Sequence, residues 1–238
     1  MNKDRIAIVI PVYNHENKVA GVIREALKLN LPLFVIDDGS TDSTYENIKD
    51  IASITIIRHG KNRGKGAAIM TGFTAAAPSS DWVITMDADA QHHPEDATNL
   101  LKAIPIGERP IIVGRREGME HRHVPWTSRF GRKFSNFWVR ACRGPKISDT
   151  QSGFRLYPLP EAKKLNVRAQ HFQFEVEVLV RAEWQGIPVL ETPVRVRYDT
   201  KDERVSHYRG WVDFLRNAGT FSRLLLMRLC ILLFKRGK

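Results

Sequence analysis

One stretch of the sequence decides the fold: Val83-Ile-Thr-Met-Asp-Ala-Asp-Ala90, which Gln91-His-His-Pro94 follows. A short apolar run bounded by polar residues is typical of a strand buried on both faces of a parallel sheet. Asp87 and Asp89 then lie at the carboxyl end of that strand, where open α/β sheets bind their ligands. In an extended chain both carboxylates point the same way and require a cation. A divalent ion bridging to substrate phosphates supplies one, whereas an isolated Asp-x-Asp is usually a solvated acidic turn.

Apolar strands and helical segments alternate around this stretch. Strands are predicted at residues 6–12, 33–36, 54–58 and 111–113. Helices are predicted after residues 13–16 to about Asn30, after the Gly-rich turn at 62–66 to Ala77, and from Pro94 onward. The Gly-rich turn has neither the spacing of a Walker A loop nor that of a dinucleotide fingerprint. The alternation predicts an α/β fold with a mostly parallel sheet and crossover helices.

Positive charge is concentrated in two late segments of the 238-residue chain. The net charge is +11, and residues 115–146 and 195–238 contribute +7 each, which leaves −3 for the remainder. Such segments suit nucleic acid, an anionic membrane surface or phosphorylated substrates. With two cysteines, no signal peptide and no apolar run of about 18 residues, we expect a cytoplasmic protein without a membrane span.

Several motifs in order resemble family 2 inverting glycosyltransferases with the GT-A fold. They are Pro11-Val-Tyr-Asn-His-Glu16, Asp37-Asp-Gly-Ser-Thr-Asp42, Asn62-Arg-Gly-Lys-Gly66 and Asp87-Ala-Asp89. The later Asp149-Thr-Gln-Ser-Gly-Phe-Arg155 is similar to the signature of the polyprenyl-phosphate group, which includes dolichyl-phosphate mannose synthases and dolichyl-phosphate glucosyltransferases. The resemblance covers residues 5–200. It implies a nucleotide-binding sheet flanked by helices, and transfer of a sugar from a UDP- or GDP-sugar to a polyprenyl phosphate or another glycan or lipid acceptor.

The resemblance also implies a donor site. Asp37 would hydrogen-bond the base, Asp87 would face the ribose, and Arg115 would grip the diphosphate. Asp89 would hold Mg²⁺ or Mn²⁺, with Gln91 just beyond. The other donor-site residues that we predict are Pro11, Tyr13, Glu16, Asp38, Lys65, Ala88, Arg204 and His207. His207 stands where mannose synthases have a lysine that closes over the donor, so the sugar and the nucleotide stay open.

Catalytic roles are predicted for Asp89 and for three residues of the second half. Arg155 would lie near the acceptor phosphate. Asp149 would orient or assist the acceptor, although an Asx turn or helix cap is the alternative interpretation. Glu175 and Glu177 lie on a predicted helix, and we favour Glu177 because relatives have an acid there.

Residues 1–209 are predicted to form the GT-A domain, and residues 210–238 an amphipathic helix. The C-terminal segment and residues 126–140 combine aromatic or aliphatic side chains with basic ones, as helices at membrane surfaces do. We therefore predict peripheral attachment to the inner face of an anionic membrane. Packing against the domain or in a homodimer is the alternative. No nucleic-acid recognition motif accompanies the charge, so nucleic acid is the less favoured partner.

Overall fold

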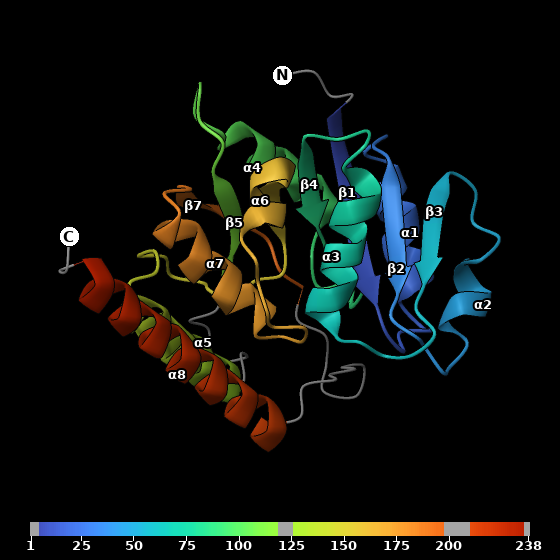
Figure 1. The fold of residues 1–238 in the computed structure, drawn as a ribbon. Helices are drawn as coiled ribbons and strands as arrows, with labels where there is room; N and C mark the ends of the chain where they lie inside the picture. Colours follow the sequence, from blue (N-terminus) through green and yellow to red (C-terminus); the bar gives the residue numbers. More distant parts are fainter. Residues whose placement is uncertain (1–4, 119–125, 198–209, 236–238) are drawn as a thin grey trace.

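The computed structural model describes residues 5–118, 126–197 and 210–235 and is built on one seven-stranded sheet (Figure 1). The strand order is β3-β2-β1-β4-β6-β5-β7. The strands are β1 (Ile6–Val12), β2 (Leu33–Asp37), β3 (Ile54–Arg58), β4 (Trp82–Thr85), β5 (Ile111–Arg116), β6 (Arg155–Pro158) and β7 (Val189–Val194). The predicted α/β class with a mostly parallel, helix-flanked sheet is confirmed.

Strand β6 is the exception to the parallel arrangement. It runs antiparallel to both of its neighbours, β4 and β5, and pairs Arg155 with Thr85 and with Val113. The other neighbouring strands are parallel. Because β6 runs the opposite way, it begins at the edge where β4 and β5 end. The segment that precedes β6 is therefore delivered to the carboxyl edge of the parallel strands.

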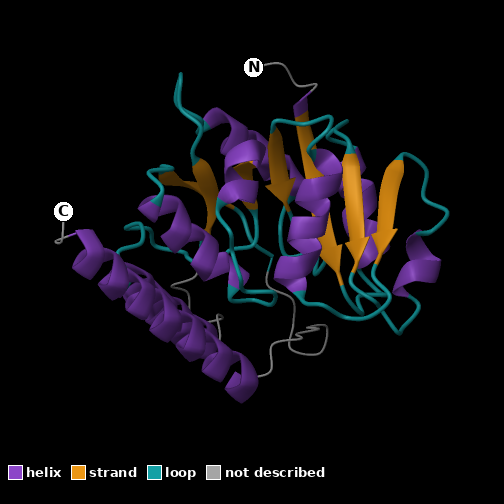
Figure 2. Ribbon diagram, in the orientation of Figure 1, coloured by secondary structure: helices purple, strands orange, loops and turns teal. Residues whose placement is uncertain are grey.

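Helices cover both faces of the sheet (Figure 2). Alternate residues of β1 enter two different cores, with Ile8 and Ile10 in one and Ala7 and Val9 in the other. The first core also contains residues of α1 (Val19–Leu27) and α4 (Ala97–Lys102). The second contains residues of α3 (Lys65–Ala76), α6 (Leu159–Lys164) and α7 (Phe174–Trp184). The short α2 (Thr44–Ile48) and the 3-10 turn η2 (Pro94–Asp96) complete these layers.

Two further helices, α5 (Trp126–Ala141) and α8 (Gly210–Lys235), lie together beside α7 (Figure 1). A third apolar cluster joins Val139 of α5, Val180 of α7, and Phe221 and Leu224 of α8. One side of α8 therefore packs on the rest of the protein. Packing against the domain was the alternative interpretation of this C-terminal segment. None of the helices in the described ranges is long and apolar enough to cross a membrane.

The contact between α3 and β1 requires glycine, which gives a test of the fold. A Cβ atom at Gly72 would lie 2.3 Å from Cγ1 of Val9, whereas one at Gly21 in α1 would have nothing within 4 Å. Gly72→Ala should therefore destabilise the protein by about 1–3 kcal/mol. Gly21→Ala should stabilise it by up to about 1 kcal/mol, because alanine loses less backbone entropy in a helix. Guanidinium denaturation measures both, and equal effects of the two substitutions would contradict this packing.

Candidate functional site

Three charged side chains from distant parts of the chain meet at the carboxyl edge of the sheet. Lys65 is the first residue of α3, Asp87 follows β4, and Glu175 lies in the first turn of α7. The Lys65 ammonium lies 2.7 Å from Oδ1 of Asp87 and also donates to Oε1 of Glu175. Burial lowers the pKa of Lys65, but the two carboxylates raise it more, so it lies above its ordinary value. Burial raises the pKa of Asp87, but the charges of Lys65 and His92 bring it well below its usual range. Lys65 and Asp87 are therefore both charged near neutral pH.

The Asp-x-Asp stretch is bent, contrary to the predicted extended conformation. Strand β4 ends at Thr85, Ala88 and Asp89 form a turn, and Ala90 has a φ of +63°. The cation beside Asp87 is Lys65, and Oδ1 of Asp89 accepts a hydrogen bond from the backbone N–H of Gln91 at 3.0 Å. The two carboxylates thus serve different partners, and metal binding by Asp89 stays a prediction.

The donor set suits a cation that takes most of its ligands from a substrate. The described residues contain no group of three or more His, Cys, Asp or Glu side chains arranged to hold a metal. A half-buried carboxylate, that of Asp89, and the nearby amide side chain of Gln91 would leave several positions for diphosphate oxygens and water. Mg²⁺ binds in this manner in nucleotide sites. The residues present therefore fit the predicted Mg²⁺ or Mn²⁺.

A glycine turn lies directly on the Lys65–Asp87 ion pair. A Cβ atom at Gly153 would lie 2.5 Å from Oδ2 of Asp87 and 2.7 Å from Nζ of Lys65. The carbonyl of Gly153 accepts a hydrogen bond from Oγ1 of Thr85 at 2.8 Å. The antiparallel β6 places this turn here, because it starts two residues later. The Ser152-Gly153-Phe154 motif thus shapes the donor site and not the acceptor side alone.

Arg155 has a structural role, contrary to the prediction that it receives the acceptor phosphate. Its side chain is fully buried. Its guanidinium donates to the carbonyls of Ser152 at 2.6 Å, Glu175 at 2.8 Å and Thr150 at 2.9 Å. Because these bonds enclose the guanidinium, Arg155 fixes the turn that covers Asp87 instead of meeting a ligand.

Glu177 is likewise structural, so the preference for Glu177 over Glu175 was wrong. Glu177 is fully buried and pairs with Arg181 at 2.7 Å and with Arg223 of α8 at 2.5 Å. Glu175 is the acid that faces Lys65. Residues two apart on a helix point about 200° apart, so only one of the two can face the site.

Asp149 forms a two-pronged ion pair with Arg116 at the end of β5. Nε of Arg116 lies 2.8 Å from Oδ2, and its terminal nitrogen lies 2.9 Å from Oδ1. Burial raises the pKa of Asp149, but Arg116 and Arg132 lower it more. An ionised, ion-paired carboxylate is a weak proton acceptor. Neighbouring Arg115 is exposed. Sequence analysis missed Arg116, although it directly follows the predicted Arg115.

Asp37 and Asp38 at the end of β2 serve different purposes. Oδ1 of Asp37 accepts a hydrogen bond from the Ser40 N–H at 2.8 Å. Its Oδ2 lies 3.0 Å from Nε of Arg58 but accepts no hydrogen bond from any residue in the described ranges. This buried oxygen suits a ligand N–H. Asp38 instead accepts from the N–H groups of Arg63 and Gly64 and so holds the Gly-rich turn, contrary to its predicted contact with the donor.

The remaining predicted donor residues that the structure describes lie in or after strands β1 and β4. Pro11 is buried in β1, and Tyr13 follows that strand. Glu16 binds across to the next loop, where its Oε2 accepts the Ser43 N–H at 2.8 Å. Ala88 is buried in the turn after β4. Arg204 and His207 lie outside the described residues.

Comparisons with known proteins agree with this geometry. The family model described as glycosyl transferase family 2 matches residues 7–160. The UDP-N-acetylglucosamine–dolichyl-phosphate N-acetylglucosaminyltransferase of Methanococcus voltae is 27% identical over 246 residues, covering 94% of this chain and 96% of that protein. The polyprenol monophosphomannose synthase of Mycolicibacterium smegmatis is 28% identical over 211 residues, covering 80% of this chain and 76% of that protein.

A solved structure shares the fold. Glucosyl-3-phosphoglycerate synthase from Mycobacterium tuberculosis, in complex with Mn²⁺, UDP and phosphoglyceric acid, superposes with a TM-score of 0.69 at 20% identity, covering 94% of this chain and 78% of that one. The predicted family is confirmed by the model match, which spans more than half of the residues. The chain belongs to glycosyl transferase family 2, and the protein is a glycosyltransferase.

Proposed function

We propose that this enzyme transfers a sugar, with inversion, from a nucleoside-diphosphate sugar to a polyprenyl phosphate. The observation that carries the proposal is the packing of Gly153 against Lys65 and Asp87. It joins the motif that resembles the lipid-phosphate transferases to the carboxylates of the donor site. The Methanococcus and Mycolicibacterium relatives are named for dolichyl phosphate and for polyprenol monophosphomannose, which supports the same acceptor class.

The donor site favours UDP over other nucleotides. The Oδ2 of Asp37, which accepts no hydrogen bond from the described residues, would accept the ring N–H of uracil or guanine, and adenine and cytosine have no such ring donor. The relative from Methanococcus voltae is named for a UDP-sugar, which supports UDP over GDP. Asp87, held by Lys65, would face the ribose.

The proposed reaction is a single displacement. An oxygen of the acceptor phosphate attacks the anomeric carbon, and the bond from that carbon to the diphosphate breaks, with its electron pair leaving on the nucleoside diphosphate. A phosphate acceptor is already ionised near neutral pH and needs no strong general base. Asp149, which is ion-paired with Arg116, therefore only has to orient the groups around the acceptor phosphate. Asp89 and Gln91 would hold the metal, which when bound offsets the negative charge of the leaving group. Exposed Arg115 would add a planar guanidinium to the diphosphate.

The acceptor phosphate needs a cation other than the enclosed Arg155. Arg116 ends β5 at the carboxyl edge and pairs with Asp149, and Arg132 of α5 is the other cation that acts on this carboxylate. We assign the acceptor phosphate to these two arginines.

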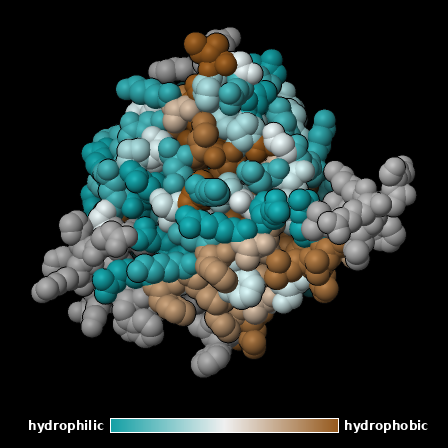
Figure 3. Space-filling view, turned by 90° about the vertical axis from the view of Figure 1, so that its left-hand side faces the viewer, coloured by the Kyte–Doolittle hydropathy of each residue, from teal (hydrophilic) through white to brown (hydrophobic). Residues whose placement is uncertain are grey.

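An exposed apolar face on α5 and α8 supports attachment to a membrane. Five large apolar side chains on these two helices are 55–64% exposed, and together we call them the docking face: Phe130, Phe137, Leu215, Leu226 and Leu229. Figure 3 shows apolar side chains gathered along the lower part of this side of the molecule, below a hydrophilic band. An exposed cluster of large apolar side chains on a folded chain marks an interaction site.

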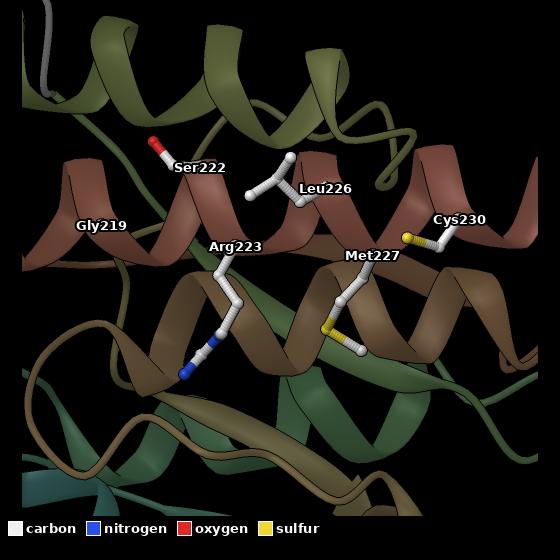
Figure 4. A pocket seen from close by; sticks show the side chains of 6 residues that line it. All are labelled: Gly219, Ser222, Arg223, Leu226, Met227 and Cys230. Carbon is white, nitrogen blue, oxygen red and sulfur yellow. The ribbon is translucent and has the colours of Figure 1, made fainter.

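The surface of α8 is hollowed within this face. The hollow has a volume of about 630 Å³ and is lined by Gly219, Ser222, Arg223, Leu226, Met227 and Cys230 (Figure 4). Arg223 and Met227 reach from α8 towards α7, while Ser222 and Leu226 point the other way (Figure 4). The hollow lies where Gly219 has no side chain, and its walls are mostly apolar.

Basic residues border the docking face on both helices, and they support an anionic partner. On α5, Lys133 and Arg140 each follow an exposed phenylalanine by three residues, and on α8 Arg216 follows Leu215. Two copies of such a face would bring like charges together, which disfavours a homodimer through it. An anionic bilayer suits both the apolar centre and the cationic border. We therefore propose peripheral attachment to the inner face of an anionic membrane.

The first test is transfer itself. A panel of nucleotide sugars with a polyprenyl phosphate should give a lipid-linked sugar only when Mg²⁺ or Mn²⁺ is present. Asp89→Asn should lower the rate by at least about a hundredfold, because the diphosphate loses its metal. Mass spectrometry of the lipid product measures both. Near wild-type turnover of this variant, or of the enzyme in EDTA, would overturn the metal assignment.

The second test concerns the base. UDP should bind more tightly than CDP, by roughly tenfold, because cytosine offers a ring acceptor where uracil offers a donor to Asp37. Asp37→Asn should remove most of this difference, since its amide both donates and accepts. Titration calorimetry gives both dissociation constants. Equal binding of CDP and UDP by the unmodified enzyme would refute the assignment of Asp37.

The third test concerns the docking face. Phe137→Ser should weaken binding to anionic vesicles roughly tenfold, since it removes a large apolar side chain from the buried part. Ile106→Ser is the matched control, because Ile106 is fully exposed but lies in the turn before β5, outside the docking face. Vesicle sedimentation measures both variants. Equal losses in the two variants, or equal binding to neutral and anionic vesicles, would show the face to be wrongly assigned.

A further inference from the structure

Arg223 connects α8 to the interior of the catalytic domain. Its guanidinium reaches Oε2 of Glu177 at 2.5 Å, and the Glu177 carboxylate is fully buried. Glu177 also accepts hydrogen bonds from the backbone N–H groups of Arg168 at 3.3 Å and Ala169 at 3.0 Å. A carboxylate that binds two backbone N–H groups fixes the chain to which they belong. Glu177 therefore ties residues 168–169 to α8.

Residues 168–170 in turn clamp the start of α3. The carbonyl of Gln170 accepts a hydrogen bond from the Ala67 N–H at 3.0 Å. A Cβ atom at Gly64 would lie 2.4 Å from that carbonyl oxygen, and one at Gly66 would lie 2.7 Å from the oxygen of Ala169. The backbone on both sides of Lys65 thus packs closely against residues 168–170. It has no room to move towards them.

We propose that Arg223 and Glu177 are positioning residues for the donor site. They hold residues 168–170 against α3, and α3 holds the Lys65 ammonium against Asp87. Neither residue touches the substrate. The inference rests on the proposed function, in which Asp87 faces the ribose of the donor. Glu177 then positions other groups and takes no part in proton transfer. The affinity for the donor also depends on how α8 packs against the catalytic domain.

Loss of the Arg223 guanidinium should weaken donor binding without slowing the chemical step. Glu177 would keep Arg181 and would be drawn towards it, which loosens residues 168–169. We expect Arg223→Met to raise the dissociation constant of UDP, and KM for the donor, about five- to tenfold, with kcat at saturating donor changed less than twofold. Arg223→Lys keeps the charge and should recover most of the affinity.

Arg216→Met is the matched control. Arg216 also lies on α8, seven residues earlier and therefore on nearly the same side of the helix, but its partner Asp213 belongs to α8 itself, at 3.1 Å. Each substitution removes one positive charge and one ion pair from α8. Only Arg223→Met should lose affinity for UDP, because only Arg223 pairs with Glu177.

The experiment is calorimetric titration of UDP with MnCl₂ into the unmodified enzyme and the three variants, with thermal melting of each. A lower Tm with unchanged UDP affinity in Arg223→Met would show a merely structural role and overturn the inference, as would equal losses in Arg216→Met. If Arg223→Met does not fold, Arg223→Lys decides, with an expected twofold to threefold loss against none for Arg216→Met. Failure of the unmodified enzyme to bind UDP would instead refute the proposed function.

Discussion

The ammonium group of Lys65 holds together three parts of the chain that are distant in sequence. It pairs with Asp87 after β4 and with Glu175 on α7, and it begins α3 itself. Removing one partner would leave a charge in a poorly solvated place, which costs several kcal/mol. The three elements must therefore keep their relative positions. One ammonium and two carboxylates leave a net charge of −1, and Asp89 nearby makes it −2, which favours a divalent cation with an anionic substrate at this edge.

The direction of β6 explains why donor and acceptor motifs converge. In a wholly parallel sheet, a motif that precedes a strand lies at the amino edge, away from Asp87 and Asp37. Because β6 is antiparallel, the turn at residues 152–154 arrives at the carboxyl edge and covers the Lys65–Asp87 pair. The buried guanidinium of Arg155 fixes that turn through backbone carbonyls. One reversed strand thus brings the motif before Arg155 to the carboxylates at the carboxyl edge, where the proposed transfer site lies.

The sheet and its ligand edge could be predicted from the sequence, because apolar runs ending in Asp37 and Asp87 place those residues at the ends of buried strands. The orientation of α7 could not. All residues from Phe174 to Ala182 are buried, so no apolar stripe shows which side faces the site, and Glu175 and Glu177 cannot be ranked without the packing. A guanidinium such as that of Arg155 has five donors, and sequence does not show whether carbonyls or a ligand will occupy them. The bend after β4 was missed because an alanine, Ala90, takes a positive φ.

The sequence of α8 is apolar on two sides, and the two sides have different consequences. Phe221 and Leu224 are buried against α5 and α7, so packing on the domain accounts for one side only. Leu215 and Leu226 stay exposed on the other, where a purely structural helix would carry polar residues. Arg223 lies between these sides, lining the exposed hollow while its guanidinium reaches the buried Glu177. In the proposed attachment, the buried ion pair would fix one side of α8 and the bilayer the other, which would leave the helix little freedom to rotate. The proposed attachment would thereby hold the donor site at a fixed orientation to the membrane that carries the proposed lipid acceptor.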